Sequence, residues 1–323
     1  MYQSPSSVPD AVTEAPAPQG LGQIAVIANT ASGTNAMDSA AIDRAIDILG
    51  RDQARLYYWS PKDSPETVVR KALLDGAQTI VAAGGDGTAM AIAGAALGQA
   101  CTFGALPLGT FNYFARGLGL PEEPDAAARA MLDCTPHDIR VGTVNGRVFL
   151  NNASLGIYPS VLKRRETVYR RWGRHRIMAH WSVIQTFLRF QRPMRLTLYA
   201  DGQTIERRTP LLFVSRSAFQ LERFGLKGGD VISHDGFAVL IGRGDTRLDL
   251  FRTAFRLVSQ TAEPGRDYEF LPVRSLDVHT ERPRGLIAYD GEKARQVAPF
   301  RFRMSTQRLT VLLPPEAARE GAA

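Results

Sequence analysis

The feature that most constrains the fold of this chain is a regular alternation of strand-like and helix-like segments over its first third. Short apolar or β-branched runs occupy residues 23–29, 54–60, 79–84 and 101–110. The segments between them carry apolar residues at helical spacing, such as Ala41, Ile42, Ala45, Ile46 and Leu49. This order predicts a parallel sheet covered by helices, which binds ligands at the carboxyl ends of its strands.

From about residue 139 the pattern changes to alternating segments separated by Asn-Gly and Asp-Gly pairs, which are typical of hairpins. We therefore predict an α/β N-terminal domain with a parallel sheet, followed by a mainly antiparallel β-sandwich C-terminal domain. The expected boundaries are a disordered tail at 1–21, a first domain at 22–138, a second domain at 139–301 and a strand at 302–316 that returns to the first domain.

Charge is unevenly distributed between the two halves of the chain. The net charge is +7 overall, −7 over residues 1–139 and +14 over residues 140–323. The basic half is expected to bind a polyanion: an anionic membrane surface, nucleic acid or phosphorylated small molecules. Because no nucleic-acid recognition motif accompanies the charge, we expect no nucleic-acid partner.

Cysteine content and the N-terminal residues bear on the compartment. Cys101 and Cys134 are the only cysteines, which excludes a disulfide scaffold and a four-cysteine zinc site. The first 20 residues lack the basic and apolar regions of a signal peptide. We therefore expect a cytoplasmic protein.

The strongest local signal is a glycine-rich loop that follows a buried strand and opens a helix. The loop consists of Gly84, Gly85, Asp86, Gly87 and Thr88. Glycines allow close approach of a ligand to the backbone, and N–H groups at a helix start favour phosphate. Asp86 would repel phosphate, so we expect it to orient Mg²⁺ and its waters or to accept a proton from a hydroxyl. The alternative is an ordinary strand-to-helix turn with Asp86 as the N-cap.

Two further polar loops are expected at the same edge of the sheet. One follows the strand at 101–107, where Thr110 and Asn112 are candidates to bind phosphate or ribose and Arg116 to neutralise charge. The alternative is a capped helix start with a solvated Arg116. The other loop follows the first strand and contains Asn29, Ser32 and Gly33. The Walker A, dinucleotide-binding and protein-kinase motifs are absent, so a nucleotide would bind by another design.

Three motifs in order carry a resemblance to a known family. They are N-x-x-S-G-T at 29–34, A-A-G-G-D-G-T at 82–88 and L-P-L-G-T-F-N-Y-F-A-R-G-L-G-L-P at 106–121. Together they resemble the bacterial diacylglycerol kinase-like lipid kinases, a group that includes sphingosine and ceramide kinases and is distantly similar to NAD kinases. The resemblance continues to about residue 314, through S-L-G-I at 154–157, H-D-G at 234–236 and D-G-E at 290–292.

The resemblance implies an ATP- and Mg²⁺-dependent lipid kinase that transfers the γ-phosphate to a membrane-lipid hydroxyl. The acceptor would be diacylglycerol, a ceramide or sphingoid base, or phosphatidylglycerol. The implied ATP site is lined by Asn29, Ser32, the 84–88 loop and Thr110, with Ser60 as a weaker candidate. Asp290 and Glu292 would lie opposite the γ-phosphate, one of them as the base, with Asp86 organising Mg²⁺ or sharing that role.

The resemblance also implies a structural Mg²⁺, bound by the carboxylate of Asp235 and the backbone carbonyls of Ile232 and Phe237. Two departures from the family pattern stand out. Tyr113 occupies a position where family members commonly have Asp. Residues 216–224 are bulkier than the usual glycine-rich segment, so acceptor entry is expected to differ.

Several alternatives stay open at this point. The D-G-E at 290–292 is also the sequence of an ordinary hairpin turn, and the shared G-G-D-G is compatible with an NAD kinase-like activity. A non-catalytic lipid- or nucleotide-binding regulator is the alternative from another class. A basic cluster at 163–176, beside an apolar helix-spaced stretch at 177–190, predicts seating on the inner face of an anionic membrane. A solvated basic face is the other interpretation of that cluster, and a homodimer is a further partner considered.

Overall fold

The computed structural model describes residues 20–29, 35–156, 193–244 and 246–315. Three of the sequence predictions fall outside these residues. They are the disordered tail, apart from its last two residues, the loop residues Ser32 and Gly33, and the basic and apolar stretches at 163–176 and 177–190.

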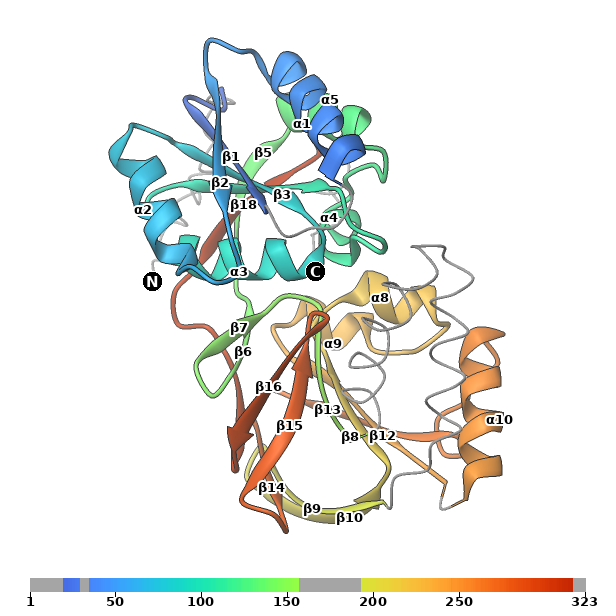
Figure 1. Ribbon diagram of the computed structural model, residues 1–323. Helices are drawn as coiled ribbons and strands as arrows, with labels where there is room; N and C mark the ends of the chain where they lie inside the picture. The colour runs from blue at the N-terminus through green and yellow to red at the C-terminus, as the bar shows by residue number, and fades with distance from the viewer. Residues whose placement is uncertain (1–19, 30–34, 157–192, 245, 316–323) are drawn as a thin grey trace, which may run out of the picture.

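The first domain is built on a six-stranded sheet in the order β2-β1-β3-β4-β18-β5 (Figure 1). Its strands are β1 (Ile24–Asn29), β2 (Ala54–Trp59), β3 (Thr79–Gly84), β4 (Thr102–Pro107), β5 (Thr135–Ile139) and β18 (Leu309–Leu313). Neighbouring strands are parallel except for β18 and β5, which are antiparallel. The central strands β1 and β3 are buried almost throughout, as expected of a parallel sheet covered on both faces.

Five helices belong to the first domain. They are α1 (Asn35–Leu49), α2 (Pro65–Leu74), α3 (Asp86–Ala96), α4 (Tyr113–Gly117) and α5 (Pro124–Leu132). Helix α1 packs beside α5 and α2 beside α3, and Figure 1 shows the two pairs on opposite sides of the sheet. Helix α3 also contacts β3 and β7 (Arg147–Phe149), so this helix lies where the two domains meet.

The second domain contains two six-stranded antiparallel sheets, in the orders β10-β9-β14-β17-β6-β7 and β13-β12-β11-β8-β15-β16. Its remaining strands are β6 (Gly142–Val144), β8 (Asn152–Gly156), β9 (Met194–Ala200), β10 (Gln203–Thr209), β11 (Leu211–Ser215), β12 (Phe237–Gly242), β13 (Tyr268–Val273), β14 (Leu276–Thr280), β15 (Arg284–Tyr289), β16 (Glu292–Val297) and β17 (Phe300–Met304). Phe149 of one sheet stacks on Phe237 of the other, with ring centroids 5.9 Å apart. The two sheets therefore share a packed aromatic interior.

In the described part of this domain, three helices accompany these sheets: α8 (Ala218–Arg223), α9 (Gly229–Ser233) and α10 (Arg247–Val258). None of the helices in the described part of the chain is long and apolar enough to cross a membrane. The expected fold class, an α/β domain with a mainly parallel sheet and a second domain of antiparallel strands, is confirmed. The exact domain boundaries stay a prediction.

Candidate active site

A cleft of about 510 Å³ lies between the two domains. The first domain contributes the start of α3 and the loop at 108–111, and the second contributes the start of β8 and the hairpin between β15 and β16. Its polar lining comes from Asn29, Asp63, Asp86, Thr88, Thr110, Asn151, Asn152, Gln220, Asp290 and Glu292. Residues from distant parts of the sequence thus meet in one cavity.

Two glycine-containing loops of the first domain pack tightly at the cleft. A Cβ built on Gly109 would lie 2.4 Å from the Cα of Gly85, so neither loop has room for a side chain there. Asn112 shapes the second loop: its Oδ1 accepts from the N–H of Gly109 at 2.8 Å, and its Nδ2 donates to the Gly109 carbonyl at 3.0 Å. Asn112 has φ of 50° and is buried, so it supports the loop from beneath.

Asp86 is a half-buried carboxylate of the cleft lining. Gly85 is the N-cap of α3, so the interpretation of Asp86 as an N-cap is wrong. Its Oδ1 instead accepts from the N–H of Phe114 at 3.0 Å and from Nδ2 of Asn151 at 3.1 Å. Burial raises the pKa of Asp86, although these hydrogen bonds act in the opposite direction. Such a carboxylate is suited to accept a proton near neutral pH.

Asn29 and Thr88 connect the first strand to the glycine loop. The Nδ2 of Asn29 donates to the Oγ1 of Thr88 at 3.1 Å, and both residues line the cleft. The loop at 84–88 is thereby tied to the end of the neighbouring strand β1. This places its N–H groups beside a cavity that a phosphate could enter.

Asp290 lies in the turn between β15 and β16, with φ of 44°. Its carboxylate accepts from three consecutive backbone N–H groups, those of Leu150, Asn151 and Asn152. Burial raises the pKa of Asp290 to about 7 against these three hydrogen bonds, and the nearby charge of Asp86 acts in the same direction as burial. Asp290 therefore fixes the backbone from which Asn151 reaches Asp86.

Another hairpin of the same domain also has an Asp in its turn whose carboxylate accepts from consecutive backbone N–H groups. Asp201, in the turn between β9 and β10, accepts from the N–H groups of Arg274 and Ser275. The D-G-E at 290–292 thus forms a hairpin turn and also lines the cleft, and its catalytic role stays a prediction. This parallel favours a supporting role for Asp290.

Glu292 is an exposed carboxylate of the cleft, as is Asp63. It is the first residue of β16, and its Oε1 lies 3.0 Å from where a Cβ on Gly87 would be. Glycine at position 87 therefore leaves space for this carboxylate beside the start of α3. Carboxylates line the cleft from both domains: Asp63 and Asp86 from the first, and Asp290 and Glu292 from the second.

The structure does not bring all predicted residues to the cleft lining. Gly84 and Asn112 are buried behind it. The Oγ of Ser60 accepts from the N–H of Lys62 at 3.3 Å in a local turn. Arg116 forms an ion pair with Glu122 at 3.5 Å and lies over the ring of Phe219, so it points away from the cavity.

Three polar residues of the cleft were not predicted from the sequence. Asn151, Asn152 and Gln220 line it, and Asn152 donates through Nδ2 to Oε1 of Gln220 at 2.9 Å. Two consecutive asparagines immediately before a buried strand are a usable signal, because buried amides require partners.

Tyr113 occupies the position at which the family that the chain resembles commonly has Asp, so this chain has no carboxylate there. Tyr113 stacks on Phe111 with ring centroids 5.3 Å apart and lies 6.4 Å from Phe219. Within the described residues, no cluster of three or more His, Cys, Asp or Glu could hold a metal ion. A Mg²⁺ that arrives with a nucleotide needs only one or two carboxylates besides phosphate oxygens and water. Asp86 and Glu292 fit that requirement.

A pH-dependence of stability follows from Asp290. Because its pKa in the folded state is about 7, above the ordinary 3.8, its contribution is fully present below pH 4 and is lost as the pH rises through 7. For a fully buried group this corresponds to about 4 kcal/mol at most. Thermal melts of the nucleotide-free protein from pH 4 to 8 should show a decline that is shallower in Asp290→Asn. Parallel profiles for the two proteins would show that Asp290 does not titrate in this range.

Comparison with known proteins shows which proteins the chain is similar to. Residues 23–144 match the diacylglycerol kinase catalytic domain family. A "Probable lipid kinase YegS-like" of Pseudomonas aeruginosa is 47% identical over 109 residues, which are 33% of this chain and 35% of that protein. The protein of the same name from Chromohalobacter salexigens is 43% identical over 93 residues, 28% of this chain and 30% of that one. The chain thus matches about a third of the length of these curated relatives.

The fold likeness extends further than the sequence likeness. The crystal structure of a diacylglycerol kinase from Bacillus anthracis superimposes with a TM-score of 0.67 at 16% identity, covering 91% of this chain and 98% of that one. The part of the chain that the sequence comparisons cover is thus similar to the catalytic domain of lipid kinases. More particularly, the match at residues 23–144 and these two curated relatives agree with the expected resemblance to the diacylglycerol kinase-like lipid kinases.

Proposed function

We propose that the protein transfers the γ-phosphate of ATP to the hydroxyl of a membrane lipid in the cleft between its two domains. The observation that carries this proposal is the meeting of the glycine loop at 84–88 with Asp86 and Glu292 in one cavity. Phosphoryl transfer depends mainly on positioning and charge neutralisation, with a carboxylate close to the attacking oxygen. The cleft offers a loop to position the phosphates, and carboxylates close to them.

The glycine loop and the start of α3 receive the phosphates. The first N–H groups of a helix have no partners within that helix and attract an anion. Gly85, Gly87 and Gly109 keep the loops free of side chains, so that phosphate oxygens can approach the backbone. Mg²⁺, when bound with ATP, would neutralise charge on the phosphates, with Glu292 as an exposed carboxylate to hold it.

Asp86 is the general base of this proposal. The lipid oxygen forms a bond to the γ-phosphorus, the bond from that phosphorus to the oxygen of the ADP leaving group breaks, and the hydroxyl proton passes to Asp86. Asn151 and the N–H of Phe114 hold Oδ1 of Asp86 in place. Asp290 acts through Asn151 as a positioning residue, because backbone N–H groups occupy both of its oxygens.

A surface of the second domain supports contact with a bilayer. Helix α10 buries Leu250 and Ala254 against the domain, while Leu248, Phe251 and Phe255 stay 55%, 41% and 67% exposed. Exposed Arg252 lies on the same helix, in the half of the chain with net charge +14. Apolar side chains beside basic ones are the composition that binds an anionic leaflet, and we propose peripheral association of the protein with such a membrane.

Changing Phe251 and Phe255 together to Ser should reduce sedimentation with phosphatidylglycerol vesicles at least tenfold, since insertion of each ring contributes on the order of 1 kcal/mol or more. The matched control is Leu74→Ser, which removes an 82% exposed apolar side chain from α2 of the first domain. This control should bind vesicles like the wild type. Equal vesicle binding by the double variant would exclude α10 as the membrane contact.

The function itself is tested by incubating the protein with γ-labelled ATP, Mg²⁺ and vesicles of mixed lipids. Mass spectrometry of the extracted lipids identifies the acceptor among diacylglycerol, ceramide, sphingoid base and phosphatidylglycerol. A labelled lipid supports the proposal. Formation of NADP from NAD without any labelled lipid would favour the NAD kinase-like alternative, and the absence of both products would favour a non-catalytic role.

A further inference from the structure

The loop between α9 and β12 is where the family resemblance implies a structural Mg²⁺, and the residues present do not fit one. The guanidinium of Arg216 already binds two of the three expected ligands. Its Nη1 donates to the carbonyl of Ile232 at 2.5 Å, and its Nη2 donates to Oδ1 of Asp235 at 3.0 Å. Mg²⁺ demands close octahedral oxygen ligands, so it cannot share these two oxygens with a guanidinium.

Arg216 is held firmly in this position. It follows β11 directly, its backbone N–H donates to the carbonyl of Asn151 at 2.7 Å, and its side chain is only 9% exposed. Asp235 has φ of 57°, and its own N–H donates to the carbonyl of Ile232. The loop therefore turns tightly around the guanidinium.

A second cation lies close to the same carboxylate. The Nη1 of Arg140 is 3.9 Å from Oδ2 of Asp235. A divalent ion at this loop would therefore face two guanidinium groups with a single carboxylate between them. Guanidinium is planar and carries several donors, which allows one side chain to bind a carboxylate and a carbonyl together.

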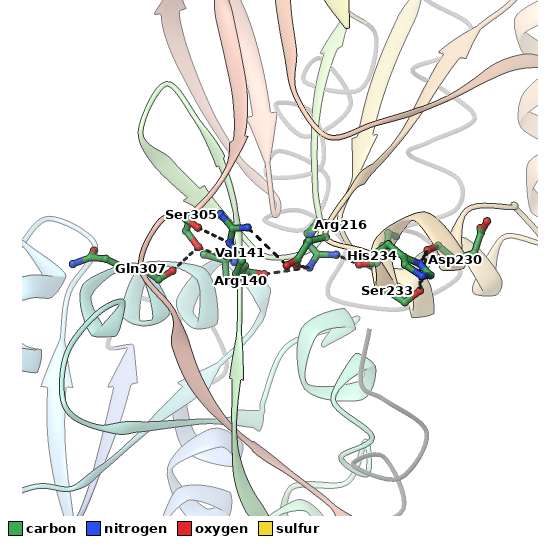
Figure 2. A network of polar contacts seen from close by, with 10 residues as sticks. Arg140, Val141, Arg216, Asp230, Ser233, His234, Ser305 and Gln307 are labelled. Carbon is green, nitrogen blue, oxygen red and sulfur yellow. Dashed lines mark hydrogen bonds and ion pairs between the residues drawn. The ribbon is translucent and has the colours of Figure 1, made fainter. Parts of the chain in front are cut away.

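This cluster lies where the chain passes between the domains. Nη2 of Arg216 also reaches the carbonyl of Arg140 at 3.3 Å. Arg140 in turn donates through Nε to the carbonyl of Ser305 at 2.9 Å, and the N–H of Val141 donates to Oγ of Ser305 at 3.0 Å. Figure 2 shows Arg216 beside Arg140, with Ser305 on the far side of Arg140 and Val141.

We propose that Arg216 is the resident cation of the α9–β12 loop, which takes the place of the structural metal ion and ties this loop to the segments that connect the domains. The loop is then formed without Mg²⁺, and the only Mg²⁺ requirement left is that of the nucleotide. This inference does not depend on which lipid is the acceptor.

The test compares melting temperatures of the nucleotide-free protein in EDTA and in millimolar Mg²⁺. The wild type should show no Mg²⁺-dependent rise in melting temperature that depends on Asp235. Arg216→Ala should melt several degrees lower in EDTA, and millimolar guanidinium chloride, far below denaturing concentrations, should recover part of the loss. Recovery of the melting temperature is expected because guanidinium ion can fill the position that the Arg216 side chain leaves empty. A lower melting temperature that guanidinium does not raise would contradict the proposal.

Asp235→Asn is the control that locates any Mg²⁺ effect. A rise of the wild-type melting temperature in Mg²⁺ that disappears in Asp235→Asn would overturn the proposal, because it would place a metal ion at this loop. A rise that persists in Asp235→Asn arises at another site and agrees with the proposal. Should Arg216→Ala fail to fold, Arg216→Lys is the second variant, because it keeps the positive charge but lacks the planar guanidinium with its several donors. Its melting temperature should respond to Mg²⁺ as that of the wild type does. Additional stabilisation of Arg216→Lys by Mg²⁺ would contradict the proposal.

Discussion

Replacing Asp86 with Asn should lower the rate of phosphate transfer by about 10²- to 10⁴-fold, the range typical for loss of a general base. The fold should survive the change, because the amide oxygen of Asn can still accept from the N–H of Phe114 and from Asn151. Since burial raises the pKa of Asp86, removal of this carboxylate should not lower the melting temperature. Steady-state kinetics and a thermal melt of the same preparation measure both effects.

Glu292→Gln is the matched comparison for this result. Glu292 lies in the same cleft but is exposed, and we assign it to the Mg²⁺-bound nucleotide. Its replacement should mainly raise the KM for ATP and shift the Mg²⁺ dependence, with a smaller change of kcat. If Asp86→Asn kept more than a tenth of the wild-type rate while Glu292→Gln abolished it, the base would be Glu292.

Gly109→Ala should destabilise the first domain by about 2–3 kcal/mol, at the upper end of the usual range for overpacking. The new Cβ would lie 2.4 Å from the backbone of Gly85 and 2.7 Å from Oδ1 of Asn112, and backbone cannot rotate away as a side chain can. Because the displaced loops line the phosphate end of the cleft, binding of ATP should weaken at least tenfold. Chemical denaturation and a nucleotide-binding titration measure the two effects.

Gly94→Ala provides the control for that prediction. Gly94 lies inside helix α3, and a Cβ there would make an ordinary contact of 3.6 Å with Val148. This variant should be more stable by about 0.5–1 kcal/mol, because glycine is unfavourable within a helix. Equal losses of stability for Gly94→Ala and Gly109→Ala would show that the contact between the two glycine loops is not the cause.

Much of the fold could be predicted because the local signals agree with it. The β-α alternation led to the parallel sheet, and the Asp-Gly pairs mark the turns between β9 and β10 and between β15 and β16. The short helices α8 and α9 were not predicted, since five or six residues carry no helical periodicity. Helix α5 was also missed, although Glu123 caps it and Pro124 begins it.

The structure brings many of the predicted site residues together, and their roles stay predictions. Asn29, Asp86, Thr88, Thr110, Asp290 and Glu292 all line one cleft. Arg116 does not, because a sequence pattern cannot show that Glu122 and Phe219 lie closer to its guanidinium than the cavity does. Arg216 takes the place of the expected metal ion by binding Asp235, which lies 19 residues further along the chain. Such non-local partners are set by tertiary structure alone.

The most direct test of the account is the transfer of label from γ-labelled ATP to lipid by the wild type and by Asp86→Asn in the same vesicles. The account predicts a labelled lipid with the wild type and a rate at least a hundredfold lower with the variant, at an unchanged melting temperature. A wild-type protein that labels no lipid, or a variant that labels lipid as fast as the wild type, would contradict the claim that phosphate transfer takes place in this cleft.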